Sequence, residues 1–78
     1  MTPRDIEQLI SAGLPDCTVR VKSDDNTHFE AVVVSADFVG KRPLQRHQMV
    51  YRTLGEAMGG EIHALSISAL TPDEQAER

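Results

Sequence analysis

Apolar residues recur with a helical period near the start of the chain, where they predict an amphipathic helix. The positions that would form its buried face are Ile6, Leu9, Ile10 and Leu14. Thr2 followed by Pro3 is typical of the start of a helix. Gly13 and Pro15 predict that this helix ends before residue 17.

The next segment changes to strict alternation, which is typical of strands covered on one side. In residues 17–22, Cys17, Val19 and Val21 alternate with polar side chains. A polar turn over residues 23–26 then joins this segment to a second strand, His28 to Val34, so the pair is predicted to form a hairpin. The valine-rich second half of that strand favours a central place in the sheet.

The longest unit runs from Phe38 to Leu65 and predicts a turn, a helix and a third strand. Gly40 allows the turn, Pro43 suits the first turn of a helix, and Gly59-Gly60 is expected to end it. Residues 61–67 then read as a strand. The predicted apolar face of the helix consists of Leu44, His47, Tyr51, Leu54 and Met58. On the opposite side we expect Arg42, Gln45, Arg46, Arg52 and Thr53.

Thr71 and Glu74 form the sequence of a capping box, which predicts a short C-terminal helix. The expected element order is therefore αββαβα. The hairpin strands must be antiparallel, whereas a helix between the second and third strands implies a parallel crossover. We predict one α+β domain over residues 1–78, a mixed three-stranded sheet with helices packed on one face.

Composition excludes several classes of function but does not identify one. A 78-residue chain buries too little surface for a deep enclosed active site, so a surface function is expected. The single cysteine, Cys17, excludes an internal disulfide and is most simply a core residue. No apolar run is long enough to cross a membrane, and there is no signal-peptide pattern. We expect a cytoplasmic protein with no membrane partner.

Positive charge is concentrated in one stretch despite a net charge of −4. Lys41, Arg42, Arg46 and Arg52 lie in a segment without any Asp or Glu. These side chains suit phosphates or the acidic surface of a protein partner. With few aromatic residues available to stack bases, nucleic-acid affinity would be modest and strongly salt-dependent.

Catalytic motifs are missing from the sequence, which contains no nucleophile elbow, P-loop, zinc-protease helix or cysteine pair. We therefore predict a non-enzymatic protein. Asp24 and Asp25 share a turn that lacks the repeated oxygen ligands of an EF-hand, so they are expected to be solvated. His47 is expected to pack. From spacing alone, His63 is a structural histidine at the strand. For His28, a polar residue at the start of the strand that bonds to the turn and a metal ligand remain equally open.

Five short segments together resemble the BolA family. They are Val33-Val34-Ser35, Phe38-x-Gly40, Leu44-x-Arg46-His47-x-x-Val50-Tyr51, Ile62-His63-Ala64-Leu65 and Thr71-Pro72. The short hairpin loop and the pair His28-Phe29 are most similar to the smaller IbaG-type branch. The resemblance covers nearly the whole chain. It implies a type II KH-like fold in a cytosolic protein.

The resemblance also implies a partner and a cofactor. Members of the family pair with monothiol glutaredoxins and share a [2Fe-2S] cluster with the glutaredoxin cysteine and glutathione. They act in iron-sulfur trafficking or in iron, redox and stress regulation. For the isolated chain we expect no cofactor and a monomer or weak homodimer.

The family histidine transfers to His63 as a cluster ligand, and the second ligand comes from the hairpin loop. Where the cysteine-bearing branch has its ligand, four residues before Phe29, this chain has Asp25. His28 is thus the expected substitute, with Asp25 as a weaker candidate. Imidazole ligation would make the cluster sensitive to protonation near neutral pH.

The alternative function is a nucleic-acid-binding transcriptional regulator that uses the basic helix. Arg42 and Arg46 lie one helical turn apart and would contact phosphates of DNA. However, Gly40-Lys41-Arg42-Pro43 does not reproduce the Gly-x-x-Gly clamp of KH domains.

Overall fold

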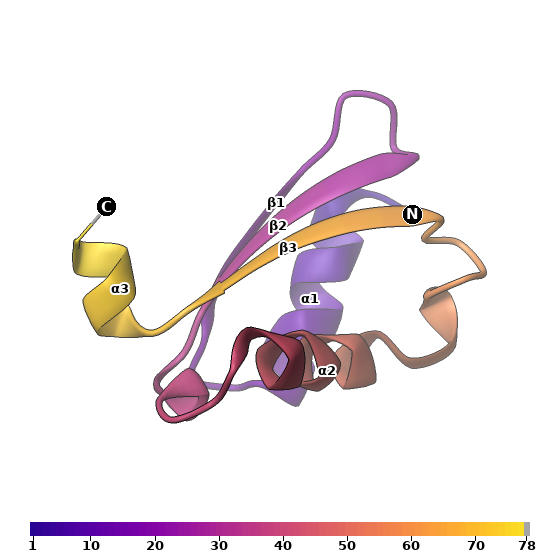
Figure 1. Cartoon of the computed structure of the whole chain (residues 1–78). Helices are drawn as coiled ribbons and strands as arrows, with labels where there is room; N and C mark the ends of the chain where they lie inside the picture. The colour runs from indigo at the N-terminus through magenta and orange to yellow at the C-terminus, as the bar shows by residue number, and fades with distance from the viewer. Residues whose placement is uncertain (78) are drawn as a thin grey trace.

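The computed structural model describes residues 1–77 and contains the predicted order of elements (Figure 1). The α-helices are α1 (Pro3–Gly13), α2 (Pro43–Leu54) and α3 (Pro72–Ala76). The strands are β1 (Thr18–Lys22), β2 (His28–Val34) and β3 (Ala64–Leu70). Two short 3-10 turns, η1 (Ala36–Phe38) and η2 (Gly55–Ala57), flank α2.

The sheet has the order β1-β2-β3, so the predicted central position of the valine-rich strand is confirmed. β1 and β2 are antiparallel, and β2 and β3 are parallel. In the parallel register His28 lies opposite Ala64, and Val34 lies opposite Leu70. The mixed sheet predicted from the element order is therefore confirmed.

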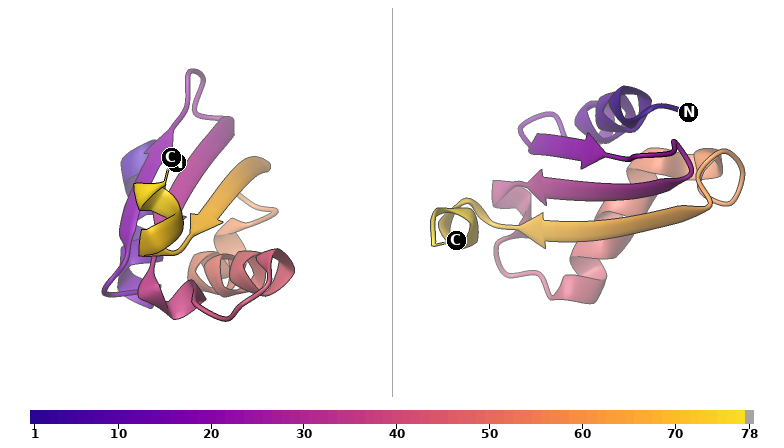
Figure 2. Two further views of the ribbon diagram at one scale, coloured as in Figure 1. Left: turned by 60° about the vertical axis from the view of Figure 1, so that its left-hand side comes forward. Right: turned by 90° about the horizontal axis from the view of Figure 1, so that it is seen from above.

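Helices α1 and α2 cover one face of the sheet, whereas α3 extends beyond the end of β3 (Figures 1 and 2). The core between these layers is apolar. It contains Ile6, Ile10, Leu14, Val21, Phe29, Ala31, Val33, Phe38, Val50, Leu54 and Ile62. The opposite face of the sheet carries no helix, so its side chains meet solvent along most of their length.

Both predicted capping boxes form. The Thr2 hydroxyl accepts a hydrogen bond from the Asp5 N–H, and the Asp5 carboxylate accepts the Thr2 N–H. Thr71 and Glu74 form the same reciprocal pair at α3. Ile6 and Ile10 are fully buried, as the helical period predicts. The final helix is only five residues long and has no buried residue.

The predicted apolar face of α2 is right at Leu54 but wrong at Leu44 and Tyr51. Leu44 is 70% exposed and Tyr51 is 40% exposed, whereas Val50 is fully buried and Leu54 nearly so. The prediction treated one helix as continuous to Met58. In the structure α2 ends at Leu54, because Gly55 takes a positive φ of 54° and turns the chain. The buried side of α2 therefore contains Val50 and Leu54, which lie one turn apart and precede Gly55.

The third strand starts later than predicted, at Ala64. Ile62 is fully buried and forms an isolated bridge with Met58, which closes the turn after η2. Gly59 takes a positive φ of 85° in this turn. His63 consequently precedes the strand and is exposed, so it does not share a strand face with Leu65 and Ile67.

On each free edge of the sheet, one side chain forms a hydrogen bond with a backbone group. On β1, the Val21 N–H donates to the Glu7 carboxylate of α1 at 2.9 Å. On β3, the Ala69 carbonyl accepts a hydrogen bond from the Arg46 guanidinium of α2 at 3.1 Å. The carbonyl of the next residue, Leu70, faces β2, where it accepts the Ser35 N–H. Successive carbonyls alternate in direction, so that of Ala69 faces the free edge.

Arg46 does not project to solvent, contrary to prediction. Its side chain is only 12% exposed. Besides the Ala69 carbonyl, it donates to the Lys41 carbonyl at 2.8 Å and to Glu74 at 2.6 Å and 3.3 Å. A guanidinium suits this position because its planar set of N–H groups serves several acceptors at once. Arg46 therefore joins α2 to β3 and α3.

Candidate functional site

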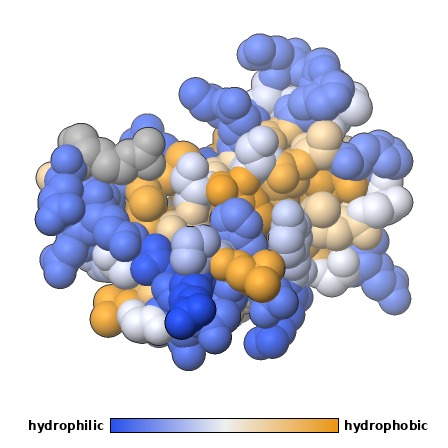
Figure 3. Space-filling model, viewed as in Figure 1, coloured by the Kyte–Doolittle hydropathy of each residue, from blue (hydrophilic) through white to orange (hydrophobic). Residues whose placement is uncertain are grey.

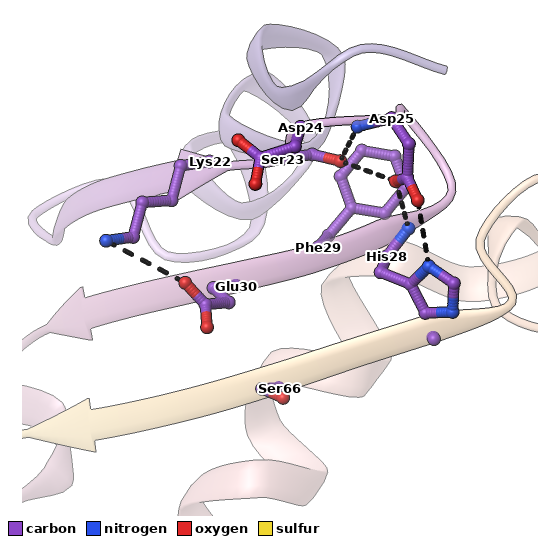
Figure 4. Close-up of a pocket in the computed structure, with 9 residues that line it drawn as sticks. Lys22, Ser23, Asp24, Asp25, His28, Phe29, Glu30 and Ser66 are labelled. Carbon is purple, nitrogen blue, oxygen red and sulfur yellow. Dashed lines mark hydrogen bonds and ion pairs between the residues drawn. The ribbon is translucent and has the colours of Figure 1, made fainter.

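The loop between β1 and β2 is organised by one carboxylate (Figure 4). Asp25 Oδ1 accepts hydrogen bonds from the N–H groups of Thr27 and His28, at 2.9 Å and 3.0 Å. Asn26 takes a positive φ of 55°, which asparagine tolerates better than most residues. The Ser23 hydroxyl accepts the Asn26 N–H at 2.9 Å. The turn thus holds β2 at a fixed starting point.

The same carboxylate orients the imidazole of His28. Asp25 Oδ2 lies 3.1 Å from His28 Nδ1, and the histidine side chain is 74% exposed. The backbone and side-chain hydrogen bonds from His28, with that from Thr27, hold the pKa of Asp25 well below its ordinary value. An ionised Asp25 accepts a hydrogen bond from the Nδ1–H of His28, which leaves Nε2 free to bind a metal.

Asp25 thereby acquires a role that the sequence analysis missed. We expected it to stand behind His28 as a weaker oxygen ligand. The structure instead places it where a carboxylate orients a metal-binding histidine through the other ring nitrogen. The spacing Asp25-x-x-His28, with a turn between the two residues, was the signal in the sequence. Only the folded turn shows that both carboxylate oxygens face His28 and its backbone.

His63 lies at the same end of the sheet as His28. It directly precedes Ala64, which is the register partner of His28 on β3, and its side chain is exposed. Neighbouring strands are separated by about 4.8 Å, so the backbones of the two histidines are close. The structure therefore places the two histidines that the sequence analysis selected at the same end of the sheet, on neighbouring strands.

A shallow pocket of about 390 Å³ lies beside His28 on the uncovered face of the sheet (Figure 4). Its walls come from the loop, from the end of β1, and from β2 and β3. They consist of Lys22, Ser23, Asp24, Asp25, His28, Phe29, Glu30, Ala64 and Ser66. Lys22 pairs with Glu30 at 3.7 Å across β1 and β2, so both charges of this pair are engaged at the rim.

The histidines supply an incomplete coordination sphere. Among residues 1–77, no three His, Cys, Asp or Glu side chains form a group able to hold a metal ion. Two imidazole nitrogens are the protein ligands of one iron in a Rieske-type centre, and His28 and His63 are exposed imidazoles at the same end of the sheet. The remaining ligands would have to come from another molecule.

The basic residues selected from the sequence do not share one environment. Lys41, Arg42 and Arg52 are exposed. Arg46 has its guanidinium bound to Glu74 and to backbone carbonyls, so the predicted four-residue basic face is reduced to three residues. The sequence analysis assigned Glu74 only to the capping box with Thr71. Its ion pair with Arg46 was therefore not predicted.

The remaining candidates have structural roles. Cys17 and His47 are both half-buried, and Cys17 packs against the core, where burial raises the pKa of its thiol.

Within the described part of the chain, every helix is too short or too polar to span a lipid bilayer.

Comparison with known proteins gives consistent matches over most of the chain. Residues 15–74 match the family model described as BolA-like protein. A human protein named BolA-like protein 1 is 47% identical over 57 residues, which is 73% of this chain and 42% of the relative. A Haemophilus influenzae protein named DNA-binding transcriptional regulator BolA is 48% identical over 48 residues, 62% of this chain and 47% of the relative.

A solved structure covers the full length. The structure of a bolA protein homologue from Coxiella burnetii has a TM-score of 0.81 and 46% sequence identity. The match spans 100% of this chain and 99% of that protein. By contrast, the chain spans less than half the length of the human and Haemophilus relatives.

Proposed function

Because the chain belongs to the BolA-like family, we propose that it is an adaptor that binds a monothiol glutaredoxin and shares or receives a [2Fe-2S] cluster. His63 and His28 are the proposed ligands from this chain. The proposed setting is iron-sulfur trafficking or iron, redox and stress regulation.

One observation carries the proposal. Two exposed histidines lie at the same end of the sheet, one immediately before the register partner of the other. Asp25 holds one ring nitrogen of His28 and leaves the other toward solvent. This arrangement supports ligation by His28 and by His63, with Asp25 as the positioning residue.

The cluster would supply electron-transfer or iron-donor chemistry, and the chain would supply its attachment. Imidazole binds iron in its neutral form, so ligation by His28 and His63 competes with protonation. Asp25 favours a single tautomer of His28 and limits the rotation of its ring. Exposure of both rings leaves room for a partner to approach.

The proposal is tested by co-expressing the chain with a monothiol glutaredoxin and purifying the complex anaerobically. Visible absorption and iron content are measured for wild type, His63→Ala and His28→Ala. We expect both variants to retain less iron, with His63→Ala losing more. Ser68→Ala, an exposed change on β3 away from the histidines, is the matched control.

An unchanged spectrum and unchanged iron retention in His63→Ala would remove His63 from the cluster. Equal iron loss in Ser68→Ala would show that the loss reflects general destabilisation. Pull-down of the apo-glutaredoxin separately reports whether the partners bind without the cluster.

DNA binding is the second candidate, and the name of the Haemophilus relative is the observation that favours it. Lys41, Arg42 and Arg52 are the exposed cations available for phosphate contacts. Duplex DNA titrated at several salt concentrations should bind wild type more tightly than an Arg42→Ala/Arg52→Ala variant, with a shallower salt dependence for the variant. Arg46 is excluded from this variant because its loss would disturb the fold. Equal weak binding by both proteins would contradict this function.

A further inference from the structure

The exposed large apolar side chains of residues 1–77 are confined to one short segment. They are Val39, Leu44 and Tyr51, with 66%, 70% and 40% of their surfaces exposed. Exposed apolar residues are common singly, but their concentration in one region marks an interaction surface. This region comprises α2 and the turn that precedes it.

Leu44 and Tyr51 lie on one side of α2. They are seven residues apart, which is nearly two turns, so their side chains emerge in almost the same direction about 10 Å apart along the axis. A partner helix with apolar side chains at positions i and i+7 matches this separation. The position of Leu44 and Tyr51 therefore favours a helical partner segment.

Charge indicates the polar chemistry of that partner. Phe38 to Gly55 contains four of the eight Lys and Arg and none of the twelve Asp and Glu. With Arg46 internally bound, Lys41, Arg42 and Arg52 remain exposed in the same segment of the chain as Leu44 and Tyr51. Figure 3 shows apolar atoms next to strongly hydrophilic atoms along the lower part of the molecule, where α2 and η1 lie.

We propose that Lys41, Arg42, Leu44, Tyr51 and Arg52 form a docking surface, the α2 surface, for an acidic amphipathic helix of a partner protein. Leu44 and Tyr51 would contact the partner's apolar side chains, and the cations would contact its flanking Asp or Glu residues. Tyrosine and arginine commonly contribute strongly at protein interfaces. Phosphate contacts to DNA would use the cations but would leave Leu44 and Tyr51 without an apolar partner.

This inference goes beyond the proposed function and does not depend on it. The first turn of α2 lies beside the Ala69 end of β3, as the Arg46 hydrogen bond shows, whereas His63 precedes the opposite end of that strand. The α2 surface and the histidines can therefore be tested separately.

The probe is a fluorescein-labelled synthetic peptide of about 18 residues, long enough to form a helix. It carries Leu and Phe seven positions apart with Glu at the flanking exposed positions. Fluorescence anisotropy measures its binding to the full chain. Leu44→Ala/Tyr51→Ala should weaken binding at least tenfold, that is by about 1.4 kcal/mol or more.

Arg42→Ala/Arg52→Ala should weaken binding mainly at low salt, because exposed charges are screened as salt rises. The matched control is Arg20→Ala/Lys22→Ala, which removes two exposed cations from β1 on the other side of the molecule. This control should bind the peptide as wild type does, and circular dichroism should show all variants folded.

Four results would overturn the proposal. One is no saturable binding of the peptide, and another is equal weakening by the β1 control. A third is that a DNA duplex binds more tightly than the peptide and is insensitive to Leu44→Ala/Tyr51→Ala, which would assign the surface to nucleic acid. The fourth is self-association in sedimentation that the same double variant abolishes, which would make a second copy the occupant.

Discussion

Two carboxylate-centred clusters lie at opposite ends of the sheet and differ in what they hold. Asp25, before β2, binds the N–H groups of its own turn and the imidazole of His28. Glu74, after β3, binds the Thr71 N–H of its own cap and the guanidinium of Arg46. In both places a local turn positions the carboxylate, and the carboxylate then engages a nitrogen-containing side chain.

The difference lies in the exposure of that side chain. His28 is 74% exposed and keeps one ring nitrogen available, whereas Arg46 is 12% exposed and also serves two backbone carbonyls. The first cluster thus leaves a ring nitrogen exposed to solvent, and the second joins α2, β3 and α3. The comparison shows that a carboxylate in a capped turn can orient an exposed side chain or hold a buried one, according to where that side chain lies in the fold.

The largest effect should come from Arg46→Ala. It removes hydrogen bonds to the Ala69 and Lys41 carbonyls in a half-buried site, and we expect the free energy of unfolding to fall by about 2 kcal/mol. Arg52→Ala, on the exposed side of the same helix, should change it by less than about 0.5 kcal/mol. Urea unfolding measures both, and equal small changes would contradict the role assigned to Arg46.

A smaller, pH-dependent effect is expected from Glu74→Gln. The Arg46 and Thr71 hydrogen bonds lower the pKa of Glu74 below its ordinary value of 4.5. The folded chain therefore binds fewer protons at Glu74 than the unfolded chain does. The stabilising effect of the ionised carboxylate is lost as pH falls below about 4.5. The stability difference between wild type and Glu74→Gln should shrink in that range. A constant difference from pH 7 to 3 would contradict this linkage.

Asp25→Asn should affect the His28 imidazole more than the fold. Hydrogen bonds from His28 and Thr27 hold the pKa of Asp25 well below its ordinary value of 3.8, so the carboxylate is ionised at neutral pH and stays ionised below pH 3.8. We expect nitrogen NMR at neutral pH to show the Nδ1–H tautomer of His28 in wild type and a mixture in the variant. The same tautomer population in both proteins would show that Asp25 does not orient the ring.

The smallest effect on stability is expected from His28→Ala and His63→Ala. Both side chains are exposed, so the free energy of unfolding should stay within about 0.5 kcal/mol of wild type. Thermal and urea unfolding of the isolated chain measure this change directly. A clear loss of stability would mean that these histidines help to hold the sheet end together, as Arg46 does at the other end.

Local rules in the sequence were sufficient for most of the fold. Capping residues such as Thr2 and Thr71, the alternation of β2 and the crossover order predicted elements that the structure confirms. The buried face of α2 was predicted only in part: Leu54 is buried, but Leu44 and Tyr51 are exposed, and the buried Val50 was left out of the predicted face. Helical periodicity also did not reveal that the positive φ of Gly55 ends the helix.

The candidate site was predictable only in part. His28 and His63 were selected by residue type and family resemblance, and the parallel register brings them to one end. The roles of Asp25 and Arg46 were not predictable, because they depend on side-chain directions and on partners far away in the sequence. Arg46 and Glu74 are separated by 28 residues, and only the packing of α2 against the end of β3 joins them.

The hydrogen bonds of Glu7 and Arg46 also govern how the sheet meets other chains. Unpaired backbone groups along an edge strand are the usual template for strand addition and aggregation. Here an incoming strand at β1 would have to displace a carboxylate from Val21, and one at β3 would have to displace a guanidinium from Ala69. Each edge strand of the sheet thus has one backbone group already hydrogen-bonded to a charged side chain, a carboxylate at β1 and a guanidinium at β3. This arrangement disfavours strand addition and favours solubility at high concentration.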